Sequence, residues 1–289
     1  MDQPRLSVVM PAKNEAGSVG QVIQGIRQHV PDAEILVVDD GSTDLTCSLA
    51  KSAGARVISH RYSMGNGAAV KTGARSATGD VIVFMDSDGQ HDPADIPRLL
   101  EQIEDGHDMA VGARSDDAHA SAGRGIANRI YNKLATYMTG QKIPDLTSGF
   151  RAARANRFRE FLYLLPNGFS YPTTITMAFF RAGYSVKYLP ITAAQRIGKS
   201  HIQPFKDGLR FLLIIFKIGT LYSPLKLFFP VALLHALLGI GYYAYTYSTA
   251  ARLSIATIFM LTAAVTIFLI GLVSEQITAL MYKDTGEVK

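Results

Sequence analysis

The sequence has no tryptophan and a single cysteine among its 289 residues. Because one cysteine cannot form a disulfide within the chain, we expect Cys47 to be a small packing residue in a reducing compartment. The net charge is +5, yet the lysines and arginines form no continuous basic block and no nucleic-acid-binding motif. We therefore expect no nucleic-acid partner, and attribute the excess charge to small anionic ligands and anionic lipid headgroups.

Long apolar runs are missing from the first 200 residues and are concentrated after Leu209. The N-terminal stretch MDQPRLSVVMPAKNE also lacks the basic flank and apolar core of a signal peptide. We therefore predict a soluble head at residues 1–203 that stays in the cytoplasm, followed by a membrane-associated tail.

Short apolar runs alternate with helix-like segments in the head. This order predicts an α/β fold with a mostly parallel sheet that is covered on both faces. The expected strands lie at residues 6–11, 34–40, 55–59, 80–86 and 108–113, with further strands at 147–152 and 184–190.

Polar loops follow the first, second and fourth apolar runs, at residues 11–15, 39–44 and 86–91. The carboxyl ends of parallel strands meet at one edge of a sheet, and ligands bind there. We therefore expect these three loops to converge on one site.

The segment DSDGQH begins at Asp86, directly after an apolar strand. Asp86 and Asp88 are two positions apart, so their carboxylates can point to the same side and hold a hard divalent cation, while Gly89 permits a sharp turn. Such a cation would neutralise the charge of a departing nucleotide diphosphate. The alternative from this motif alone is a turn with an aspartate helix cap before Pro93.

Other polar segments near the expected site are less specific. The carboxylates of Asp39 and Asp40 suit hydrogen bonds to a base or ribose, although the following residues could simply cap a helix. Lys13 and Glu15 place one charge of each sign at the same sheet edge. The stretch from Gly65 to Lys71 resembles a nucleotide-binding turn but lacks the G-K-[ST] ending of a phosphate loop.

The tail begins with an expected amphipathic interfacial helix over residues 204–224, in which Lys206, Arg210 and Lys217 recur among apolar residues. Residues 225–247 and 253–273 are each long enough to cross a bilayer core of about 30 Å. The short link permits only a hairpin, and the distribution of Lys and Arg predicts cytoplasmic termini. A buried hairpin in a soluble domain is the alternative. His235 and Glu275 are expected in packing and interfacial positions.

Taken in order, these motifs resemble glycosyltransferase family 2, in particular its polyprenyl-phosphate branch, which includes dolichol-phosphate mannose synthase. The matching segments run from residue 6 to residue 201: VVMPAKNE, ILVVDDGSTD, GNGAAVKTGARSATGD, VIVFMDSDGQHDP, VGAR, DLTSGFRA and RIGKSH. The two-span tail is also similar to this branch. The resemblance implies a GT-A fold, inversion at the anomeric carbon, and Mg²⁺ or Mn²⁺ as cofactor.

The resemblance also implies roles for individual residues. The positions that match the nucleotide pocket are Pro11, Lys13, Glu15, Asp39, Asp40 and Lys71. The positions that match the metal site are Asp86, Asp88 and Gln90. The positions that match the acceptor-phosphate site are Arg114, Arg124 and Asn128. The positions that match a loop closing over the diphosphate are Arg196, Lys199 and Ser200. For the cationic residues of the last two groups, the alternative is a position on a solvated face or in contact with the membrane surface.

A lipid phosphate is a chemically sensible acceptor, because a phosphate monoester is already largely ionised at neutral pH. Catalysis then rests on Asp88, Arg114 and the metal, which compensate charge, rather than on a strong base. Asp145 is expected to act either as a base or to orient the sugar, and we favour orientation. The implied partners are a nucleotide-sugar donor, a polyprenyl phosphate, the lipid bilayer of the plasma membrane and a separate flippase; a homo-oligomer is compatible with the hairpin.

Three other functions compete with this interpretation. Processive polysaccharide synthases of the same superfamily carry a Gln-x-x-Arg-Trp element and more membrane spans, whereas this chain has no tryptophan and one hairpin. Transfer to a hydroxyl acceptor and a non-catalytic nucleotide-sugar-binding scaffold stay open. The sequence favours a UDP-sugar slightly over GDP-mannose, and it does not separate undecaprenyl from dolichyl phosphate.

Overall fold

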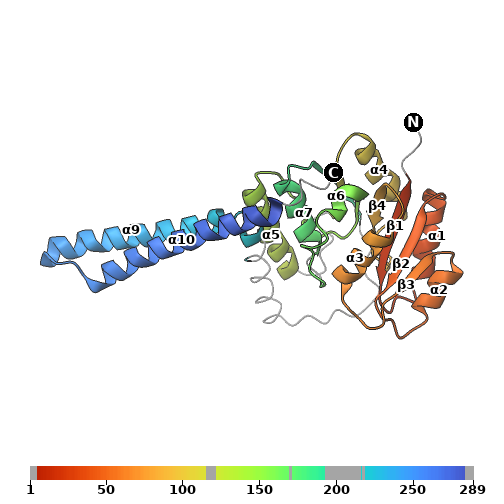
Figure 1. Cartoon of the computed structure of the whole chain (residues 1–289), viewed down its shortest axis with the longest axis horizontal. Helices are drawn as coiled ribbons and strands as arrows, with labels where there is room; N and C mark the ends of the chain where they lie inside the picture. The colour runs from red at the N-terminus through yellow and green to blue at the C-terminus, as the bar shows by residue number, and fades with distance from the viewer. Residues whose placement is uncertain (1–4, 115–121, 169–170, 193–215, 217–218, 284–289) are drawn as a thin grey trace. The chain divides into compact units, whose positions relative to one another are not determined.

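The computed structural model describes residues 5–114, 122–168, 171–192, 216 and 219–283. The chain divides into two compact units, Met1–Gln203 and Pro204–Lys289, and each is described by itself. The first unit is an α/β domain and the second contains two long apolar helices (Figure 1).

The first unit alternates strands and helices along the chain. Its strands are β1 (Leu6–Ala12), β2 (Glu34–Asp39), β3 (Arg56–Ser59), β4 (Val81–Phe84), β5 (Met109–Arg114), β6 (Arg151–Arg154) and β7 (Val186–Ile191). Its helices are α1 (Val19–His29), α2 (Thr46–Ser52), α3 (Asn66–Ser76), the 3₁₀ turn η1 (Pro93–Asp95), α4 (Ile96–Glu104), α5 (Ala122–Thr139), α6 (Ala155–Arg159) and α7 (Tyr171–Arg181).

The strands form one seven-stranded sheet in the order β3-β2-β1-β4-β6-β5-β7. Every neighbouring pair is parallel except the two that involve β6, which runs antiparallel to β4 and to β5. The predicted α/β fold with a mostly parallel sheet is therefore confirmed. The expected strand at 147–152 is shifted, because pairing begins only at Arg151 and residues 147–150 form a loop.

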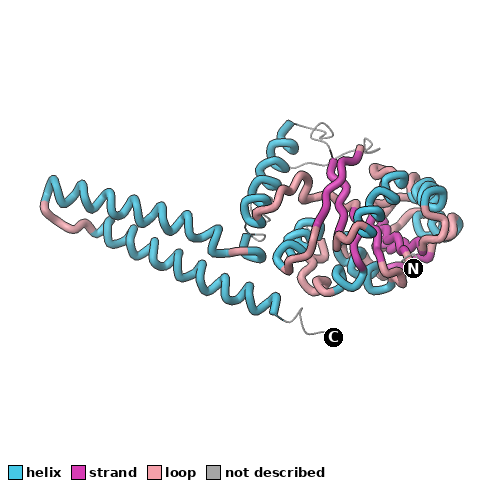
Figure 2. The backbone as a smooth tube through the Cα atoms, turned by 90° about the horizontal axis from the view of Figure 1, so that it is seen from above, coloured by secondary structure: helices cyan, strands magenta, loops and turns pink. Residues whose placement is uncertain are grey.

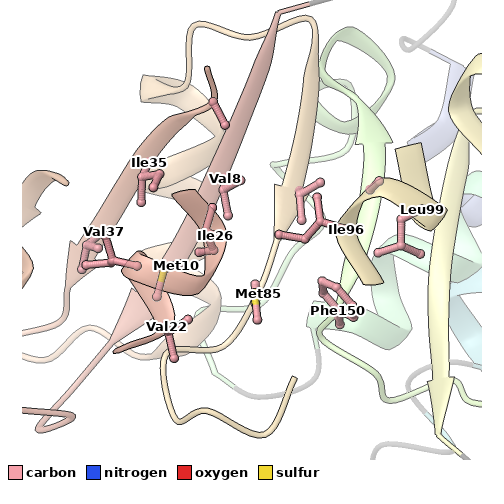
Figure 3. Packing of buried hydrophobic residues seen from close by; sticks show 14 of the residues in the cluster. Val8, Met10, Val22, Ile26, Ile35, Val37, Met85, Ile96, Leu99 and Phe150 are labelled. Atoms are coloured by element: carbon pink, nitrogen blue, oxygen red, sulfur yellow. The ribbon is translucent and has the colours of Figure 1, made fainter. Parts of the chain in front are cut away.

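One face of the sheet packs against α1 and α4. Val8 and Met10 of β1 lie in the same buried cluster as Ile26 of α1 and Ile96 of α4, as Figure 3 shows. The runs of Val, Ile and Leu in β1, β2 and β4 are buried on both faces, which is why they are continuous rather than alternating.

The opposite face of the sheet is covered by α3 and α6. A Cβ on Gly73 of α3 would lie only 2.2 Å from Val9 Cγ1, so the helix rests directly on β1. Phe158 of α6 stacks on Phe84 of β4 with ring centroids 4.3 Å apart. With both faces covered, the polar strand ends are left at the edge of the sheet.

The second unit contains α9 (Pro224–Ala250) and α10 (Ile255–Lys283), which lie side by side along their length in both views (Figures 1 and 2). Both are long and apolar enough to cross a membrane, by length and composition, over Pro224–Ala250 and Ile255–Met281. Ala251 takes a left-handed conformation with φ of 47° at the link between them.

The helices extend further than the sequence predicts, because α10 continues ten residues beyond position 273. Glu275 therefore lies inside α10, where its Oε2 accepts hydrogen bonds from Leu225 N at 3.2 Å and Ser223 Oγ at 3.4 Å. These donors lie at the start of α9, so Glu275 satisfies an N-terminal backbone group of the other helix. His235 bonds through Nδ1 to Val231 O at 2.8 Å within α9. Most of the expected interfacial helix lies outside the described residues, although residues 219–222 are helical.

Candidate functional site

A pocket of about 470 Å³ opens at the carboxyl ends of β1 and β4. This volume is within the range of small-molecule sites in proteins. The loops that follow β1, β2 and β4 all contribute to it, as their common position at one sheet edge predicts. The lining residues are Pro11, Ala12, Lys13, Glu15, Asp40, Ser63, Gly65, Asn66, Ala69, Asp86, Ser87, Asp88, Gln90, Thr147, Gly149, Tyr171 and Pro172.

Hydrogen bonds connect these three strand-end loops. Asn14 Oδ1 accepts from Thr43 N at 2.9 Å, which ties the β1 loop to the β2 loop, and Asn14 adopts a positive φ of 56°. Ser87 Oγ donates to Pro11 O at 2.9 Å, and Ser18 Oγ donates to Ser87 O at 2.7 Å. The β4 loop is thus held against β1 and α1, and the polar side chains of the pocket stand on a connected frame.

Asp40 is a carboxylate of the pocket with four hydrogen bonds. Its two oxygens accept from His60 Nδ1 at 2.8 Å, Ser63 Oγ at 2.8 Å, Met64 N at 2.7 Å and Gly65 N at 2.9 Å. Burial raises the pKa of Asp40, but these hydrogen bonds outweigh it and lower the pKa from 3.8 to about 2. Asp40 is therefore ionised, and it holds the loop at residues 60–65 in place.

The other predicted nucleotide residues at this edge differ in position. Lys13 and Glu15 line the pocket, and Lys13 Nζ donates to Ser63 Oγ at 2.8 Å. Asp39 is buried and is not a lining residue; its Oδ1 accepts from Ser42 N at 3.1 Å within its own loop. Of the aspartate pair, only Asp40 reaches the pocket in this structure.

Lys71 does not line the pocket, contrary to the expectation for a nucleotide-binding residue. Its Nζ donates to Leu165 O at 3.0 Å and to Asn167 Oδ1 at 2.5 Å. The start of α3 is also close to this segment, since a Cβ on Gly67 would lie 2.0 Å from Pro166 O. Lys71 therefore connects α3 to the segment at residues 165–168 through hydrogen bonds, and it is not among the residues that line the pocket.

The predicted metal residues Asp86, Asp88 and Gln90 all line the pocket. Gly89 has a φ of +75°, a left-handed conformation that glycine adopts without strain, and it turns the chain between Asp88 and Gln90. Asp88 Oδ1 accepts from Gln90 N at 3.1 Å across this turn. The motif therefore forms the tight turn that its sequence predicts.

These side chains fit a hard divalent cation that is only partly coordinated by protein. Among the described residues, no three or more His, Cys, Asp or Glu side chains gather as a complete metal cage. The donors at hand are two carboxylates and one amide, which suits an ion that takes its remaining oxygens from a bound phosphate. Space beside Asp86 depends on Gly149, because a Cβ there would lie 3.0 Å from Asp86 Oδ2.

Residues from outside the three strand-end loops also bound the pocket, among them Thr147, Gly149, Tyr171 and Pro172, which we call the wall. Tyr171 Oη donates to Gly149 O at 3.3 Å, so the two parts of the wall are bonded to each other. Tyr171 is buried, and burial raises its pKa, so it stays a neutral phenol at physiological pH.

Arg114 and Asp145 form a bidentate ion pair next to the wall. Arg114 Nε donates to Asp145 Oδ2 at 2.8 Å, and Nη2 donates to Asp145 Oδ1 at 3.1 Å and to Thr147 Oγ1 at 2.8 Å. Neither residue of the pair lines the pocket. Burial raises the pKa of Asp145, but the bonds from Arg114 outweigh it, so the pKa is lowered overall.

This geometry differs from both roles expected for Asp145. A carboxylate with a lowered pKa is a poor proton acceptor, and its oxygens are directed to Arg114 and Thr147 rather than into the pocket. Asp145 acts here on Arg114: it holds the guanidinium in one orientation, and hydrogen bonding to Asp145 raises the pKa of Arg114 against the effect of burial.

His91 is a buried residue beneath the pocket that the sequence did not single out. Its ring stacks on Phe150 with centroids 5.1 Å apart, and its Nδ1 has no hydrogen-bond partner among the described residues. Burial lowers the pKa of His91, although Asp86 and Asp88 act in the opposite direction. His91 is thus a neutral ring that packs under the acidic motif.

Several predicted residues cannot be compared with the structure. Arg124 and Asn128 lie on α5, but their side chains are outside the described part. Arg196, Lys199 and Ser200 lie outside the described residues altogether. The sequence does not predict the wall: residues 147–152 are expected to form a strand and are part of the segment DLTSGFRA that resembles the family, but not as lining residues. Tyr171 and Pro172 carry no local signal, since they reach the pocket from a helix that starts at residue 171.

Comparison with known proteins identifies two family models along the chain. Residues 7–162 match the model described as glycosyl transferase family 2, and residues 223–280 match the one described as GtrB C-terminal hairpin. The first match covers the three strand-end loops and half of the wall, and the second covers α9 and most of α10.

Two relatives resemble most of the chain. A dolichyl-phosphate hexose transferase of Haloferax volcanii is 30% identical over 205 residues, which is 70% of this chain and 89% of the relative. An undecaprenyl-phosphate mannosyltransferase of Micrococcus luteus is 29% identical over 215 residues, which is 68% of this chain and 86% of the relative.

A solved structure has a similar fold. Glucosyl-3-phosphoglycerate synthase from Mycobacterium tuberculosis, crystallised with Mn²⁺ and uridine-diphosphate-glucose, matches with a TM-score of 0.61 and 23% identity. The similarity covers 75% of this chain and 78% of that one, and it supports the GT-A fold of the first unit.

Proposed function

Because the chain belongs to glycosyltransferase family 2, we propose that it transfers a sugar from a nucleotide diphosphate to polyprenyl phosphate, with inversion at the anomeric carbon. The observation that carries this proposal is the presence of two matches in one chain: the transferase domain with its acidic pocket, and the C-terminal hairpin. The relatives named as dolichyl-phosphate and undecaprenyl-phosphate transferases support the class of acceptor.

In this proposal the strand-end loops hold the nucleotide diphosphate. Pro11, Lys13, Glu15 and Asp40 line the part of the pocket next to the loop at residues 60–65, where a nucleoside would lie. Asp86, Asp88 and Gln90 would bind Mg²⁺ or Mn²⁺, which supplies charge compensation for the leaving diphosphate when bound. The neighbour that contains Mn²⁺ and UDP-glucose supports this class of cofactor.

The acceptor phosphate would approach from the side of the wall, where Arg114 lies. A phosphate monoester has a second pKa of about 6, so its attacking oxygen is already ionised at neutral pH and no base has to remove a proton. A permanently charged guanidinium suits the binding of such a group, although the Nε and Nη2 of Arg114 already donate to Asp145 and Thr147. Asp145, by fixing Arg114, would set the direction from which the phosphate attacks. Arg124, Asn128, Arg196, Lys199 and Ser200 remain candidates for further phosphate contacts.

The tail would bring the pocket to the lipid substrate. We propose that α9 and α10 cross the plasma membrane with the catalytic domain and both termini in the cytoplasm, because Lys and Arg are concentrated before Pro224, with Lys283 and Lys289 beyond the second predicted span. The product would then be used on the other side only after a separate flippase moves it. A UDP-sugar is the favoured donor, with GDP-mannose as the alternative, and the hairpin is compatible with a homo-oligomer.

The proposal is tested by supplying purified full-length protein in detergent with Mg²⁺ or Mn²⁺, a short polyprenyl phosphate and labelled UDP- and GDP-sugars. We expect label from one donor to enter the organic phase. Asp88→Asn should lower that rate by at least about 100-fold, because a charge-compensating group is lost. Asp95→Asn is the matched control, since Asp95 pairs with Arg98 outside the pocket and its loss should leave the rate unchanged.

The same experiment separates the competing functions. Label in a water-soluble glycoside would indicate a hydroxyl acceptor. Nucleotide binding without turnover of any donor would indicate a nucleotide-sugar-binding scaffold. Either result would overturn transfer to lipid phosphate.

A further inference from the structure

Arg151 is a fully buried arginine directly behind the wall. It is the first residue of β6, its exposed fraction is 0%, and among the described residues it has no carboxylate within ion-pair distance. Arg114, which is partly exposed, has the bidentate partner Asp145. A buried cation without a counter-ion is expensive, so its position calls for a physical reason.

The guanidinium of Arg151 is held by neutral acceptors from both parts of the wall. Its Nη2 donates to Ser148 O, between Thr147 and Gly149. Its Nη1 donates to Pro172 O at 3.1 Å and to Thr176 Oγ1 at 3.1 Å. Arg151 therefore joins the loop before β6 to the first turn of α7 from behind.

The backbone that Arg151 fixes is the backbone that bounds the pocket. Gly149 lies beside Asp86, since a Cβ there would be 3.0 Å from Asp86 Oδ2, and Pro172 lines the pocket directly. A shift of Ser148 or Pro172 would thus move the wall towards or away from the acidic motif. Small displacements of this kind are costly in catalysis, because reacting groups must be aligned closely.

The charge of Arg151 also acts on the pocket. Burial lowers the pKa of Arg151, and Asp145 and Asp86 are among the groups that oppose this effect. Its Nε and the Oγ of Ser148 are buried without hydrogen-bond partners among the described residues. Since buried polar atoms are nearly always paired, this segment is not arranged for stability alone.

We propose that Arg151 is a positioning residue of the transfer reaction: it fixes the wall at the distance from Asp86 that the sugar and the acceptor require, and it sets a positive charge behind them. The reaction that Arg151 would assist rests on the proposed function. Its effect on the geometry of the wall does not. The strand-end loops that we propose to hold the nucleotide contain none of the groups to which Arg151 donates, so nucleotide binding should be largely independent of Arg151.

The test compares Arg151→Lys and Arg151→Met with wild type in the full-length protein. Lysine keeps the charge but cannot bond to Ser148 O and Pro172 O together. We expect kcat to fall about 10-fold or more in Arg151→Lys and further in Arg151→Met. The dissociation constant for the nucleoside diphosphate, measured by calorimetry with Mn²⁺, should change less than about 3-fold, because its loops are intact.

Arg154→Lys is the matched control on the same strand. Arg154 donates one hydrogen bond to Ile103 O at 2.8 Å and does not line the pocket, so its substitution should leave kcat unchanged. An Arg151→Lys protein with wild-type kcat would overturn the proposal. So would parallel loss of kcat, nucleotide binding and thermal stability, since that is the behaviour of a merely structural residue.

Thr176→Val decides the question if the arginine variants do not fold. It removes one acceptor of Arg151 with little change of shape, and kcat should fall about 5-fold with unchanged nucleotide affinity. An unchanged kcat would contradict the proposed role. If wild type transfers no sugar to lipid phosphate, the function above fails separately. Arg151 is then tested by the affinity for a nucleotide sugar relative to the nucleoside diphosphate: a fall of about 10-fold in Arg151→Lys supports its role, and no change overturns it.

Discussion

The two sides of the pocket are built in different ways. On the side of the strand-end loops, charge is carried mainly by carboxylates, with Lys13 as a cation among them, and Asp40 is held by backbone N–H groups, a serine and a histidine. Behind the wall, charge is carried by arginines: Arg114 is held by Asp145, and Arg151 by carbonyl groups and a threonine.

The difference has a physical meaning for the proposed reaction. The acidic side suits a cation and the polar groups of a nucleotide, whereas the basic side suits a phosphate that arrives as an anion. Two anionic substrates can then be brought together without direct contact between the carboxylates of one side and the phosphate that enters from the other.

Among the substitutions that distinguish the two sides of the pocket, we expect Asp145→Asn to lower the free energy of unfolding most. This change removes the counter-ion of Arg114, whose side chain is only 27% exposed, and should lower the free energy of unfolding by about 3 kcal/mol. Because the native pKa of Asp145 is lowered, its contribution is present above its unfolded pKa of about 3.9 and is lost as the pH falls below that value.

Denaturant unfolding at pH 7 and at pH 3 measures this effect, which should be smaller at pH 3. Turnover of Asp145→Asn should fall without loss of the acidic limb of its pH profile, since Asp145 positions Arg114. A variant that is fully folded, and whose strongly reduced residual activity has lost the acidic limb, would instead identify Asp145 as the base.

Asp40→Asn is the same substitution on the other side, and we expect a smaller loss of about 2 kcal/mol. An asparagine replaces one of the two oxygens of Asp40, each of which accepts two of the four hydrogen bonds, but it leaves no buried cation uncompensated. The pKa of about 2 means that this stability is present above about pH 4 and is lost between about pH 4 and pH 2. The expected order is contradicted if Asp40→Asn lowers the free energy of unfolding more than Asp145→Asn does when both are measured across the same acid titration.

The smallest effect on nucleotide binding is expected for Lys71→Met. Lys71 Nζ is bonded to Leu165 O and Asn167 Oδ1, outside the pocket, so the dissociation constant for a nucleoside diphosphate should change less than about 2-fold. Calorimetry with Lys13→Met alongside provides the contrast, because Lys13 lines the pocket. A loss of affinity for the nucleoside diphosphate of more than about 10-fold in Lys71→Met would instead support the direct contact between Lys71 and the nucleotide that the sequence suggested.

Much of the acidic side could be predicted from sequence because it is local. The loops after β1, β2 and β4 are each a short polar segment after an apolar strand, and parallel strands bring such ends to one edge. Asp86, Asp88 and Gln90 lie within five residues of each other, so a single turn places them together. The α/β fold and the two apolar helices follow from periodicity and length in the same way.

The basic side was decided only by tertiary structure. Sequence reasoning expected a strand at 147–152, but β6 begins only at Arg151 and runs antiparallel between β4 and β5, which leaves residues 147–150 as a loop and Arg151 buried. Arg114 and Asp145 are 31 residues apart in the sequence, and Arg151 is 21 residues from Pro172 of α7, to which it donates a hydrogen bond. Such pairs depend on which strands are neighbours, and no local pattern of side chains carries that information.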